Sequence, residues 1–422
     1  MFPRQLYYVA QTMLNQWKTP EEIKKLQEKR IRKLLHYAYE KTPLFHEKCR
    51  ELNINPSDFH KLEDIKKFPC TSKADMRESF PEGVVSPDYD IARCYRAATS
   101  GSTGQNLYIV YSPEAYEYYM AISFRNFAAL GYKPWQKFAY MRYEPIKIKT
   151  QFYEKLGITR RLYISVYSEP EEQLNIVRGF NPHAVTGYPS MLIEWAKLLK
   201  EQGNTIHPHF IRCEAEILTK EAKEFMEDVF SCSIYEEYGS AEFVLHMSEC
   251  LHGGFHISSD SILMEFLVDG EEAAPGEEGD IHITSLVSYA MPFIRYKIDD
   301  RGIPLDEKCT CGRGLPLMKL VVGRDDDFLV LPSGKRVNPR VIIPYFELAP
   351  GVKEFRIIQK KKDFIVIDLI KGPLFTEEVH QTLRKSLLDT LREPVEIVFN
   401  FCDEIPRGRH NRPRPIQSLV DR

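Results

Sequence analysis

The spacing of apolar residues predicts an opening helix from Glu21 to Lys41. Its apolar positions recur at i, i+3, i+4 and i+7, which places them on one buried face, while Lys and Glu occupy the opposite face. These positions are Ile31, Leu34, Leu35 and Ala38. We expect this helix to have a structural role.

The middle of the chain alternates short β-rich runs with helical patterns. The β-rich runs are Leu107–Tyr111, Ser233–Glu236, His256–Leu267 and Asp280–Leu286. Between them, a helix is expected to begin at Thr219, which is a suitable N-cap, and to place an apolar face from Ala222 to Val229. This alternation predicts an α/β architecture of layered sheets and helices.

The pattern changes after about Arg324. Two strands joined by the polar turn Lys360–Asp363 are followed by a helix, with Val379, Leu383 and Leu387 in line, and then by a strand at Val395–Phe401. We therefore expect a large α/β domain over residues 1-324 and a smaller α+β domain over residues 325-422.

Composition narrows the classes of partner. The 422 residues carry 57 basic and 60 acidic side chains, a formal net charge of -3, so we expect neither a nucleic-acid nor a membrane-surface partner. No apolar run approaches the roughly 18 to 20 residues that cross a bilayer. Nine cysteines are too few for a disulfide scaffold of this length. We expect a soluble, cytoplasmic protein in which clustered cysteines are candidates for metal binding.

The segment Thr99-Ser100-Gly101-Ser102-Thr103-Gly104 is the strongest local signal for ligand binding. Its glycines let the backbone approach a ligand closely, and its hydroxyls and backbone N–H groups can surround phosphate oxygens. The same composition is common in flexible Ser/Gly turns, and the segment lacks the Lys of a Walker-type loop. Taken alone, it does not separate a phosphate loop from an ordinary turn.

Three further segments place carboxylates in turns. Tyr238-Gly239-Ser240-Ala241-Glu242 follows a predicted strand, and its Glu could hold a metal ion bound to nucleotide phosphates. Arg295–Asp300 and Gly323–Asp327 combine carboxylates, which can bind ribose hydroxyls, with an Arg, which can hold an anionic group. Each segment alone is most simply an ordinary solvated turn. The ordered set makes that interpretation weak.

In this order, the four motifs resemble those of the adenylate-forming ligase superfamily: acyl-CoA synthetases, nonribosomal-peptide adenylation domains and luciferases. The chain is most similar to the phenylacetate-CoA ligase branch and, within it, to the CapK-like group, which includes enzymes that adenylylate a deazaflavin cofactor. Branch markers are matched at Leu34–Tyr39, Lys61–Asp64, Phe68–Lys73 and Gly187–Ser190. The resemblance covers nearly the whole chain and implies a large AMP-binding domain with a smaller, mobile C-terminal domain.

The resemblance implies a reaction in two halves. ATP and a carboxylic acid first give an acyl-adenylate and pyrophosphate, and a nucleophile, often the thiol of CoA, then displaces AMP. The implied ATP- and AMP-binding residues are Thr99, Ser100, Gly101, Ser102, Thr103, Gly104, Ala215, Glu216, Tyr238, Gly239, Ser240, Asp300 and Arg324. Among these, Asp300 would bind the ribose and Ala215 with Glu216 would lie beside adenine. Glu242 would bind Mg²⁺, and Asp326 would be the hinge of the C-terminal domain.

The chain departs from the family pattern at several positions. Gln105-Asn106 follows the segment Thr99–Gly104, which we call the hydroxyl loop, in place of Lys-Pro. Asp299 and Glu214 stand where glycines are usual. In the C-terminal tail, where the family places a Gly-Lys, our alignment puts Asn411-Arg412. Arg412 keeps the positive charge, but a planar guanidinium is not equivalent to a compact ammonium at a crowded transition state. Arg412 is therefore the candidate catalytic cation of an adenylation step that we expect to be slow or altered.

Cys250, His256, Cys309 and Cys311 make a Cys₃His set, which suits tetrahedral Zn²⁺ in a closed site. Glycines at 253, 254 and 312 allow the tight turns that would bring these ligands together. From the residues alone, buried free cysteines and a strand histidine are the alternative, because the spacing is not that of a standard finger. The CapK-like resemblance implies zinc here, with a structural role, since four protein ligands leave no position for water.

Three hypotheses of function stay open. The first is an ATP-dependent ligase that joins a small-molecule carboxylic acid, aromatic or flat if Tyr143, Tyr188 and Phe243 are pocket walls, to CoA or an amine. The second is adenylylation of a cofactor or saccharide-linked acid as the end product. The third is a nucleotide-binding homologue whose catalysis is weakened because Arg412 replaces the lysine. Homodimerisation is compatible with all three.

Overall fold

The computed structural model describes residues 2–99, 107–142, 152–203, 206–321, 328–337, 341–405 and 415–420. Its contacts divide the chain into two compact units. Unit 1 is Met1–Tyr132 with Glu237–Val321, and unit 2 is Lys133–Glu236 with Val322–Arg422. The domain boundary predicted between residues 324 and 325 lies outside the described residues and stays a prediction.

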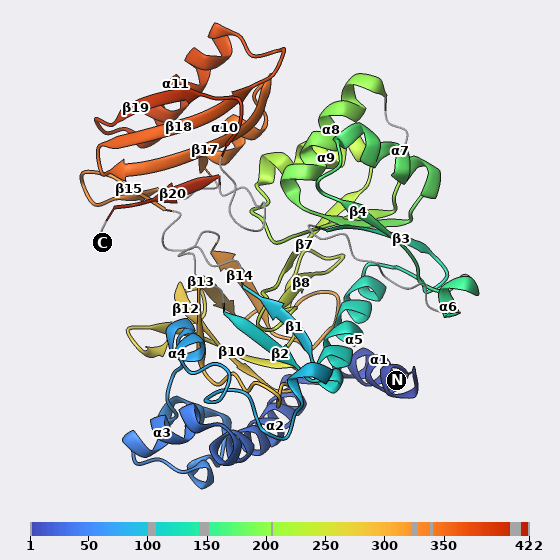
Figure 1. Ribbon diagram of the computed structural model, residues 1–422, viewed down its shortest axis with the longest axis vertical. Coiled ribbons are helices and arrows are strands. Elements are labelled where there is room, and N and C mark those ends of the chain that lie inside the picture. The colour runs from blue at the N-terminus through green and yellow to red at the C-terminus, as the bar shows by residue number, and fades with distance from the viewer. Residues whose placement is uncertain are drawn as a thin grey trace. The chain divides into compact units, whose positions relative to one another are not determined.

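The helices of unit 1 come first in the chain and are drawn in blue and cyan in Figure 1. They are α1 (Phe2–Asn15), α2 (Pro20–Lys41), α3 (Pro43–Glu51), α4 (Lys73–Glu78) and α5 (Pro113–Ala129), with 3₁₀ turns at Pro56–Asp58, Leu62–Lys67 and Ile91–Arg93. Helix α2 begins with a capping box, because Thr19 accepts from the N–H of Glu22 and Glu22 accepts from that of Thr19. Its predicted apolar face is buried, which confirms the opening helix.

The strands of unit 1 form a hairpin and an antiparallel sheet. The hairpin is β1 (Tyr95–Ala98) with β2 (Tyr108–Tyr111). The sheet has the order β11-β10-β12-β13-β14-β9-β8-β7. Its strands are β7 (Ser233–Tyr238), whose last two residues belong to this unit, β8 (Met247–Glu249), β9 (Phe255–Ile257), β10 (Ile262–Val268), β11 (Glu271–Glu272), β12 (Gly279–Ser285), β13 (Tyr296–Leu305) and β14 (Leu317–Val321).

One predicted β-run of unit 1 was wrong in its extent. The run His256–Leu267 is divided into β9 and β10 by the turn 258–261. In this turn the hydroxyl of Ser261 donates to the carbonyl of Ser258, and Asp260, which is fully buried, forms an ion pair with Arg125 at 2.9 Å. A buried charge needs such a partner, and the contact is made by a residue far away in the sequence, so the local pattern did not reveal it.

The first part of unit 2 is a parallel sheet with the order β7-β6-β5-β3-β4. Its strands are β3 (Lys137–Arg142), β4 (Arg160–Ser165), β5 (Ala184–Gly187), β6 (Phe210–Glu214) and the start of β7; its helices are α6 (Phe152–Lys155), α7 (Pro170–Phe180), α8 (Pro189–Gln202) and α9 (Lys220–Phe230). Thr219 caps α9 by accepting from the N–H of Ala222, which confirms the predicted helix start. Alternation of strands and helices along the chain produces this parallel sheet.

The C-terminal part of unit 2, drawn in orange and red in Figure 1, contains a four-stranded sheet with the order β19-β18-β17-β20. Its elements are β15 (Leu329–Val330), β16 (Arg336–Val337), α10 (Ile343–Glu347), β17 (Val352–Lys361), β18 (Phe364–Lys371), α11 (Glu377–Leu391), β19 (Glu396–Phe401) and β20 (Ile416–Ser418). Leu383 and Leu387 of α11 pack into one core with Ile357 and Ile367 of the sheet. The α/β class with a small C-terminal α+β part is confirmed.

Within the described ranges, no helix has both the length and the apolar content that crossing a bilayer requires.

Candidate active site and metal centre

Two motifs of unit 1 are joined by a reciprocal pair of hydrogen bonds. The hydroxyl of Tyr238, the last residue of β7, donates to Asp300 Oδ2 in β13 at 2.6 Å. The hydroxyl of Tyr296, the first residue of β13, donates to Glu242 Oε1 at 3.0 Å. Each motif therefore supplies one tyrosine and one carboxylate, and each tyrosine holds the carboxylate of the other motif. We call these four residues the crossed pairs.

The turn after β7 depends on Gly239. A Cβ on this residue would lie 2.0 Å from the carbonyl oxygen of Val244, so any side chain would collide with backbone. The close approach arises because the N–H of Val244 donates to the carbonyl of Ser240 at 2.9 Å. Within the same turn the N–H of Glu242 donates to Ser240 Oγ at 3.2 Å. This turn therefore requires a glycine at position 239.

In the crossed pairs, a tyrosine hydroxyl donates to each carboxylate. The tyrosines are neutral donors, so they orient the carboxylates without cancelling their charge. Glu242 is 5% exposed and Tyr296 is 1% exposed, and the Tyr296 ring packs edge-on against Phe293 at 5.1 Å between centroids. A carboxylate held by buried aromatic residues has little rotational freedom, which suits it to bind a metal ion or a hydroxyl in one geometry.

Arg295 begins the third motif and has a structural role. Its guanidinium forms an ion pair with Glu265 at 2.9 Å and donates to the carbonyls of Lys66 and Phe68 at 3.0 and 2.9 Å. The Arg295 side chain is buried. The expectation that an Arg of this motif holds an anionic ligand is therefore not met by Arg295, because its donors are directed at protein acceptors.

One departure from the family pattern, and one residue next to another departure, have an unusual backbone conformation. Asp299, where glycine is usual, has φ +65°, and Ala215, next to the departure at Glu214, has φ +64°. Both values lie in the left-handed region, which Asp tolerates and which costs Ala roughly 1 to 2 kcal/mol. The chain thus adopts at these positions a conformation that glycine would favour, with side chains in its place.

The loop containing Ala215 belongs to unit 2. On either side of Ala215, Glu214 Oε1 accepts from the hydroxyl of Tyr140 and Glu216 Oε2 accepts from the N–H of Ser190 at 2.9 Å. Burial raises the pKa of Tyr140 well above its usual value, so this hydroxyl stays protonated and can donate. Both carboxylates are oriented by protein donors.

Thr99 closes the base of the hydroxyl loop. Its N–H donates to the carbonyl of Leu107 at 3.0 Å, and its Oγ1 accepts from the N–H of Leu107 at 3.1 Å. The hairpin β1–β2 therefore brings the two ends of the loop together. The remaining candidates of the loop, Ser100, Gly101, Ser102, Thr103 and Gly104, lie outside the described residues, as do Arg324, Asp326 and Arg412.

The four residues predicted to bind zinc come together in unit 1. The ligand atoms of Cys250, His256, Cys309 and Cys311 all lie within 4.8 Å of one another. His256 Nδ1 donates to the carbonyl of Leu315 at 3.1 Å, which leaves Nε2, 3.2 Å from Cys311 Sγ, to face the cluster. Burial lowers the pKa of His256 to about 4, so its imidazole is neutral, the form that ligates metals. We call this set the Cys–His cluster.

Neighbouring residues hold the Cys–His cluster tightly. A Cβ on Gly254 would lie 2.7 Å from Cys309 Sγ, so this glycine gives the thiol its space. On the other side, Arg313 Nε donates to Gln16 Oε1 at 2.9 Å and its guanidinium lies 5.5 Å from the ring centroid of Trp17. The loop that carries Cys309 and Cys311 thereby contacts the turn between α1 and α2.

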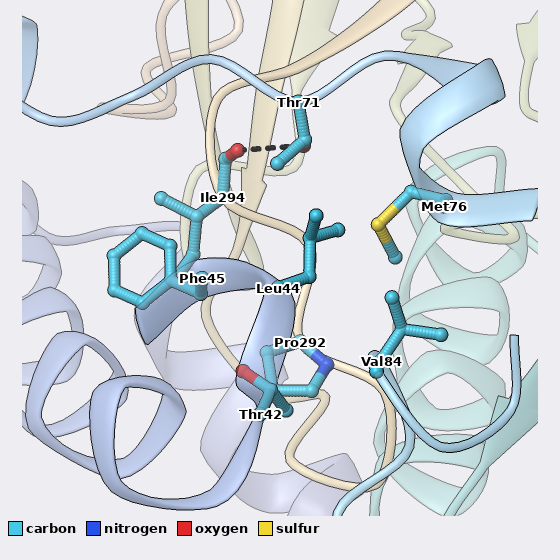
Figure 2. A pocket seen from close by; sticks show the side chains of 9 residues that line it. Thr42, Leu44, Phe45, Thr71, Met76, Val84, Pro292 and Ile294 are labelled. Atoms are coloured by element: carbon cyan, nitrogen blue, oxygen red, sulfur yellow. Dashed lines mark hydrogen bonds between the residues drawn. The ribbon is translucent and has the colours of Figure 1, made fainter. Parts of the chain in front are cut away.

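A small pocket of unit 1 has none of the crossed-pair or Cys–His residues in its lining, although its residue Thr71 forms a β-bridge with Tyr296. Figure 2 shows its mostly apolar side chains, with Thr71 at one side, whose hydroxyl donates to the carbonyl of Ile294 at 2.9 Å. The lining residues are Thr42, Leu44, Phe45, Thr71, Met76, Gly83, Val84, Pro292 and Ile294. None of them is charged, so the pocket offers no group that would hold a phosphate or a carboxylate.

Sequence reasoning missed the partners that orient the candidate site. It named Tyr238 as a nucleotide-binding residue without its contact to Asp300, and it gave no role to Tyr296. A tyrosine that opens a β-strand is ordinary core composition, and its contact with Glu242 spans 54 residues. The signal that could have found it is that each of the two motifs contains a tyrosine together with a carboxylate.

Sequence comparison finds curated relatives along most of the chain. It is 28% identical to the phenylacetate-coenzyme A ligase of Thermus thermophilus over 361 residues, which are 81% of this chain and 79% of that protein. The enzyme of the same name from Escherichia coli is 28% identical over 78% of each chain, and Protein CapK of Staphylococcus aureus is 22% identical over 92% of this chain and 89% of that protein. No protein-family model matches.

Solved structures share the fold. A 2-hydroxyisobutyryl-CoA ligase in the postadenylation state matches with a TM-score of 0.78 at 16% identity, over 97% of this chain and 91% of that one. An anthranilate-CoA ligase in complex with anthranoyl-AMP matches with a TM-score of 0.57 at 13% identity, over 78% and 67%.

The chain is an adenylate-forming ligase by class, as its four ordered motifs indicate. Over most of its length it is similar to phenylacetate-CoA ligases and to CapK. The predicted resemblance is confirmed.

Proposed function

We propose that this protein activates a carboxylic acid with ATP as an acyl-adenylate and then transfers the acyl group to CoA, releasing pyrophosphate and AMP. The observation that carries the proposal is the crossed pairs, since they orient two carboxylates of the nucleotide motifs inside a chain similar to acid-CoA ligases. An acid substrate is already ionised at neutral pH. Its activation therefore depends more on donors and cations around the α-phosphate than on a general base.

Each carboxylate of the crossed pairs has a separate role in this proposal. Asp300 accepts from the ribose hydroxyls, and the Tyr238 hydroxyl at 2.6 Å fixes the carboxylate plane for that contact. Glu242 binds Mg²⁺, which when bound neutralises charge on the ATP phosphates. The hydrogen bond from the Tyr296 hydroxyl orients the Glu242 carboxylate, whose oxygens are of the kind that Mg²⁺ prefers as ligands.

The other candidate residues complete the nucleotide site in the proposal. Ala215 and Glu216 lie beside adenine, and Tyr238 and Gly239 line the nucleotide and acyl pocket. Ser240 is a further nucleotide-binding residue. The hydroxyl loop Thr99–Gly104 holds the phosphates, with Arg324 near the ribose. Arg412 stabilises charge that develops on the α-phosphate, and Asp326 is the hinge about which the C-terminal part changes position between the two half-reactions.

The Cys–His cluster binds one Zn²⁺ with a structural role in this proposal. Three thiolates and one neutral imidazole within 4.8 Å match the soft donors and the tetrahedral number that zinc prefers. All four positions are filled by protein, so the site has no place for a reacting water.

The test is pyrophosphate release from ATP across a panel of aryl, acyl and amino acids, with and without CoA. We expect acid-dependent pyrophosphate release and, when CoA is present, free AMP and an acyl-CoA. Glu242→Gln is the matched inactive control. Absence of acid-dependent release in zinc-replete protein contradicts the proposal, and release in which AMP stays attached to the acid indicates adenylylation as the end product.

A further inference from the structure

His246 lies next to Tyr238, one of the residues of the crossed pairs. It ends the turn that follows Gly239, and its N–H donates to the carbonyl of Tyr238 at 2.9 Å. Its ring is 4.6 Å from the Tyr238 ring, centroid to centroid, and 5.5 Å from that of Phe243. The imidazole is therefore packed against the tyrosine that holds Asp300.

Neither ring nitrogen of His246 has a hydrogen-bond partner among the described residues. The side chain is fully buried, and burial lowers its pKa to about 3, which keeps the ring neutral. A neutral imidazole has one donor and one acceptor. Buried polar groups normally have partners, and one without them points to a missing water, ion or ligand group.

A buried histidine elsewhere in unit 1 shows the usual arrangement. His282 in β12 is also buried, but its Nδ1 donates to the carbonyl of Arg295 at 3.3 Å. His256 likewise uses one nitrogen for the carbonyl of Leu315. His246 differs from both, and it is the one of the three that packs against a residue of the proposed nucleotide and acyl pocket.

We propose that His246 is a specificity-determining residue that selects acids bearing a hydroxyl group, by pairing its unpartnered ring nitrogens with that hydroxyl. A hydroxyl both donates and accepts, so it is complementary to a neutral imidazole, whereas an apolar substituent would leave the nitrogens unpaired. The neighbouring Tyr238 ring, which is only partly buried, provides apolar surface for the rest of the acyl group. The inference rests on the proposed function and names the substrate class of the same site.

The experiment compares matched acids that differ by one hydroxyl. The pairs are phenylacetate with 4-hydroxyphenylacetate, benzoate with 3-hydroxybenzoate, and isobutyrate with 2-hydroxyisobutyrate. The measurement is kcat/KM for pyrophosphate release by the wild-type chain and by His246→Phe, His246→Gln and His282→Phe. His246→Phe keeps a planar ring without nitrogens, His246→Gln keeps one donor and one acceptor, and His282→Phe is the matched buried control.

We expect the wild-type chain to favour the hydroxylated member of at least one pair by about tenfold or more, because a site built to bind a hydroxyl rejects the analogue that lacks it. In His246→Phe this ratio should fall to about one. His246→Gln should keep part of the preference, and His282→Phe all of it. His246→Phe should also raise the melting temperature of the free protein, whereas His282→Phe, which breaks a hydrogen bond, should lower it.

Two results overturn the inference, and they differ from failure of the proposed function. Equal ratios in the wild-type chain and His246→Phe, with acids turned over by both, mean that the His246 nitrogens bind only a water. A loss of preference in His246→Gln as complete as in His246→Phe means that ring shape, not hydrogen bonding, decides selectivity. If no acid gives pyrophosphate with the wild-type chain, the ligase proposal itself fails and the inference fails with it.

Discussion

The crossed pairs and the Cys–His cluster are both polar groups of unit 1, but they are stabilised in different ways. In the crossed pairs, each carboxylate accepts from a tyrosine hydroxyl, so the arrangement is complete with protein atoms alone. In the Cys–His cluster, three thiols and an imidazole converge within 4.8 Å. Deprotonated thiols at this distance repel one another unless a cation lies between them.

From this difference we expect the Cys–His cluster, and not the crossed pairs, to depend on a metal for its fold. The crossed pairs are preorganised, so removing a ligand or changing one carboxylate should alter binding and catalysis with little effect on stability. The Cys–His cluster joins its loop to β9 through His256 and Cys311, and its metal affinity is therefore linked to folding. The variants below test this separation of function from stability.

The largest expected effect is that of Glu242→Gln on catalysis. Loss of the negative charge removes a Mg²⁺ ligand, and we expect pyrophosphate release to slow by about 100- to 1,000-fold, the scale of losing one important transition-state contact. The melting temperature should change by no more than about 2 °C, because Gln can still accept from Tyr296. The rate of pyrophosphate release and thermal unfolding measure the two effects. A large loss of stability would contradict the separation of function from stability.

The next effect is on stability, at the Cys–His cluster. Cys309→Ser should abolish stoichiometric zinc and lower the free energy of unfolding by about 3 kcal/mol, since loss of a structural metal is one of the mechanisms behind large single-mutant effects. Elemental analysis and denaturant unfolding measure both quantities. Cys70→Ser, at an exposed cysteine outside the cluster, is the control. Wild-type protein that is well folded, reduced and free of zinc would disprove the metal site.

Replacing Asp300 by Ala should weaken nucleotide binding. A hydrogen bond to a charged group contributes about 1.5 to 3 kcal/mol, so the Kd for ATP should rise by about 10- to 100-fold, and the rise in melting temperature induced by ATP with Mg²⁺ should shrink accordingly. Calorimetric titration measures the affinity. An unchanged ATP-induced shift would remove Asp300 from the ribose site.

Arg412→Ala tests the tail, whose role comes from alignment alone. Pyrophosphate release should slow by about tenfold or more while the Kd for ATP stays within about twofold, because the cation acts on charge that develops in the transition state. Arg412→Lys should retain or raise the rate. The same substitution to Ala at Arg407, Arg409 and Arg414 provides the controls, and equal rates in all four variants would mean that the tail has no catalytic part.

The smallest expected effect is that of the tyrosine hydroxyls. Tyr296→Phe and Tyr238→Phe each remove one hydrogen bond to a carboxylate that can still bind its own ligand. We expect each to cost about 0.5 to 1.5 kcal/mol, seen as a fewfold loss in kcat/KM for Tyr296→Phe and in ATP affinity for Tyr238→Phe. An effect as large as that of Glu242→Gln would show that catalysis and nucleotide binding depend mainly on the tyrosines and not on the carboxylates.

Local patterns in the sequence were sufficient for elements that one stretch of chain stabilises. Helix α2 with its buried stripe, helix α9 with its Thr219 cap, and the β17–β18 hairpin all depend on contacts within a few residues. The ordered motifs also placed the chain in its superfamily, because each motif is a short segment. The run His256–Leu267 was misjudged in extent because a distant arginine, Arg125, stabilises the buried carboxylate of its turn.

The sequence by itself therefore determined the class of protein, the candidate carboxylates and the membership of the Cys–His cluster. Only the tertiary structure decided that Tyr238 holds Asp300 and Tyr296 holds Glu242, that the ligand atoms of the Cys–His cluster converge, and that His246 is buried without a partner. The physical reason is how far apart in the sequence the contacting residues lie. Periodicity and turn chemistry report forces between neighbours in the chain, whereas these contacts join β-strands and turns that folding alone brings together.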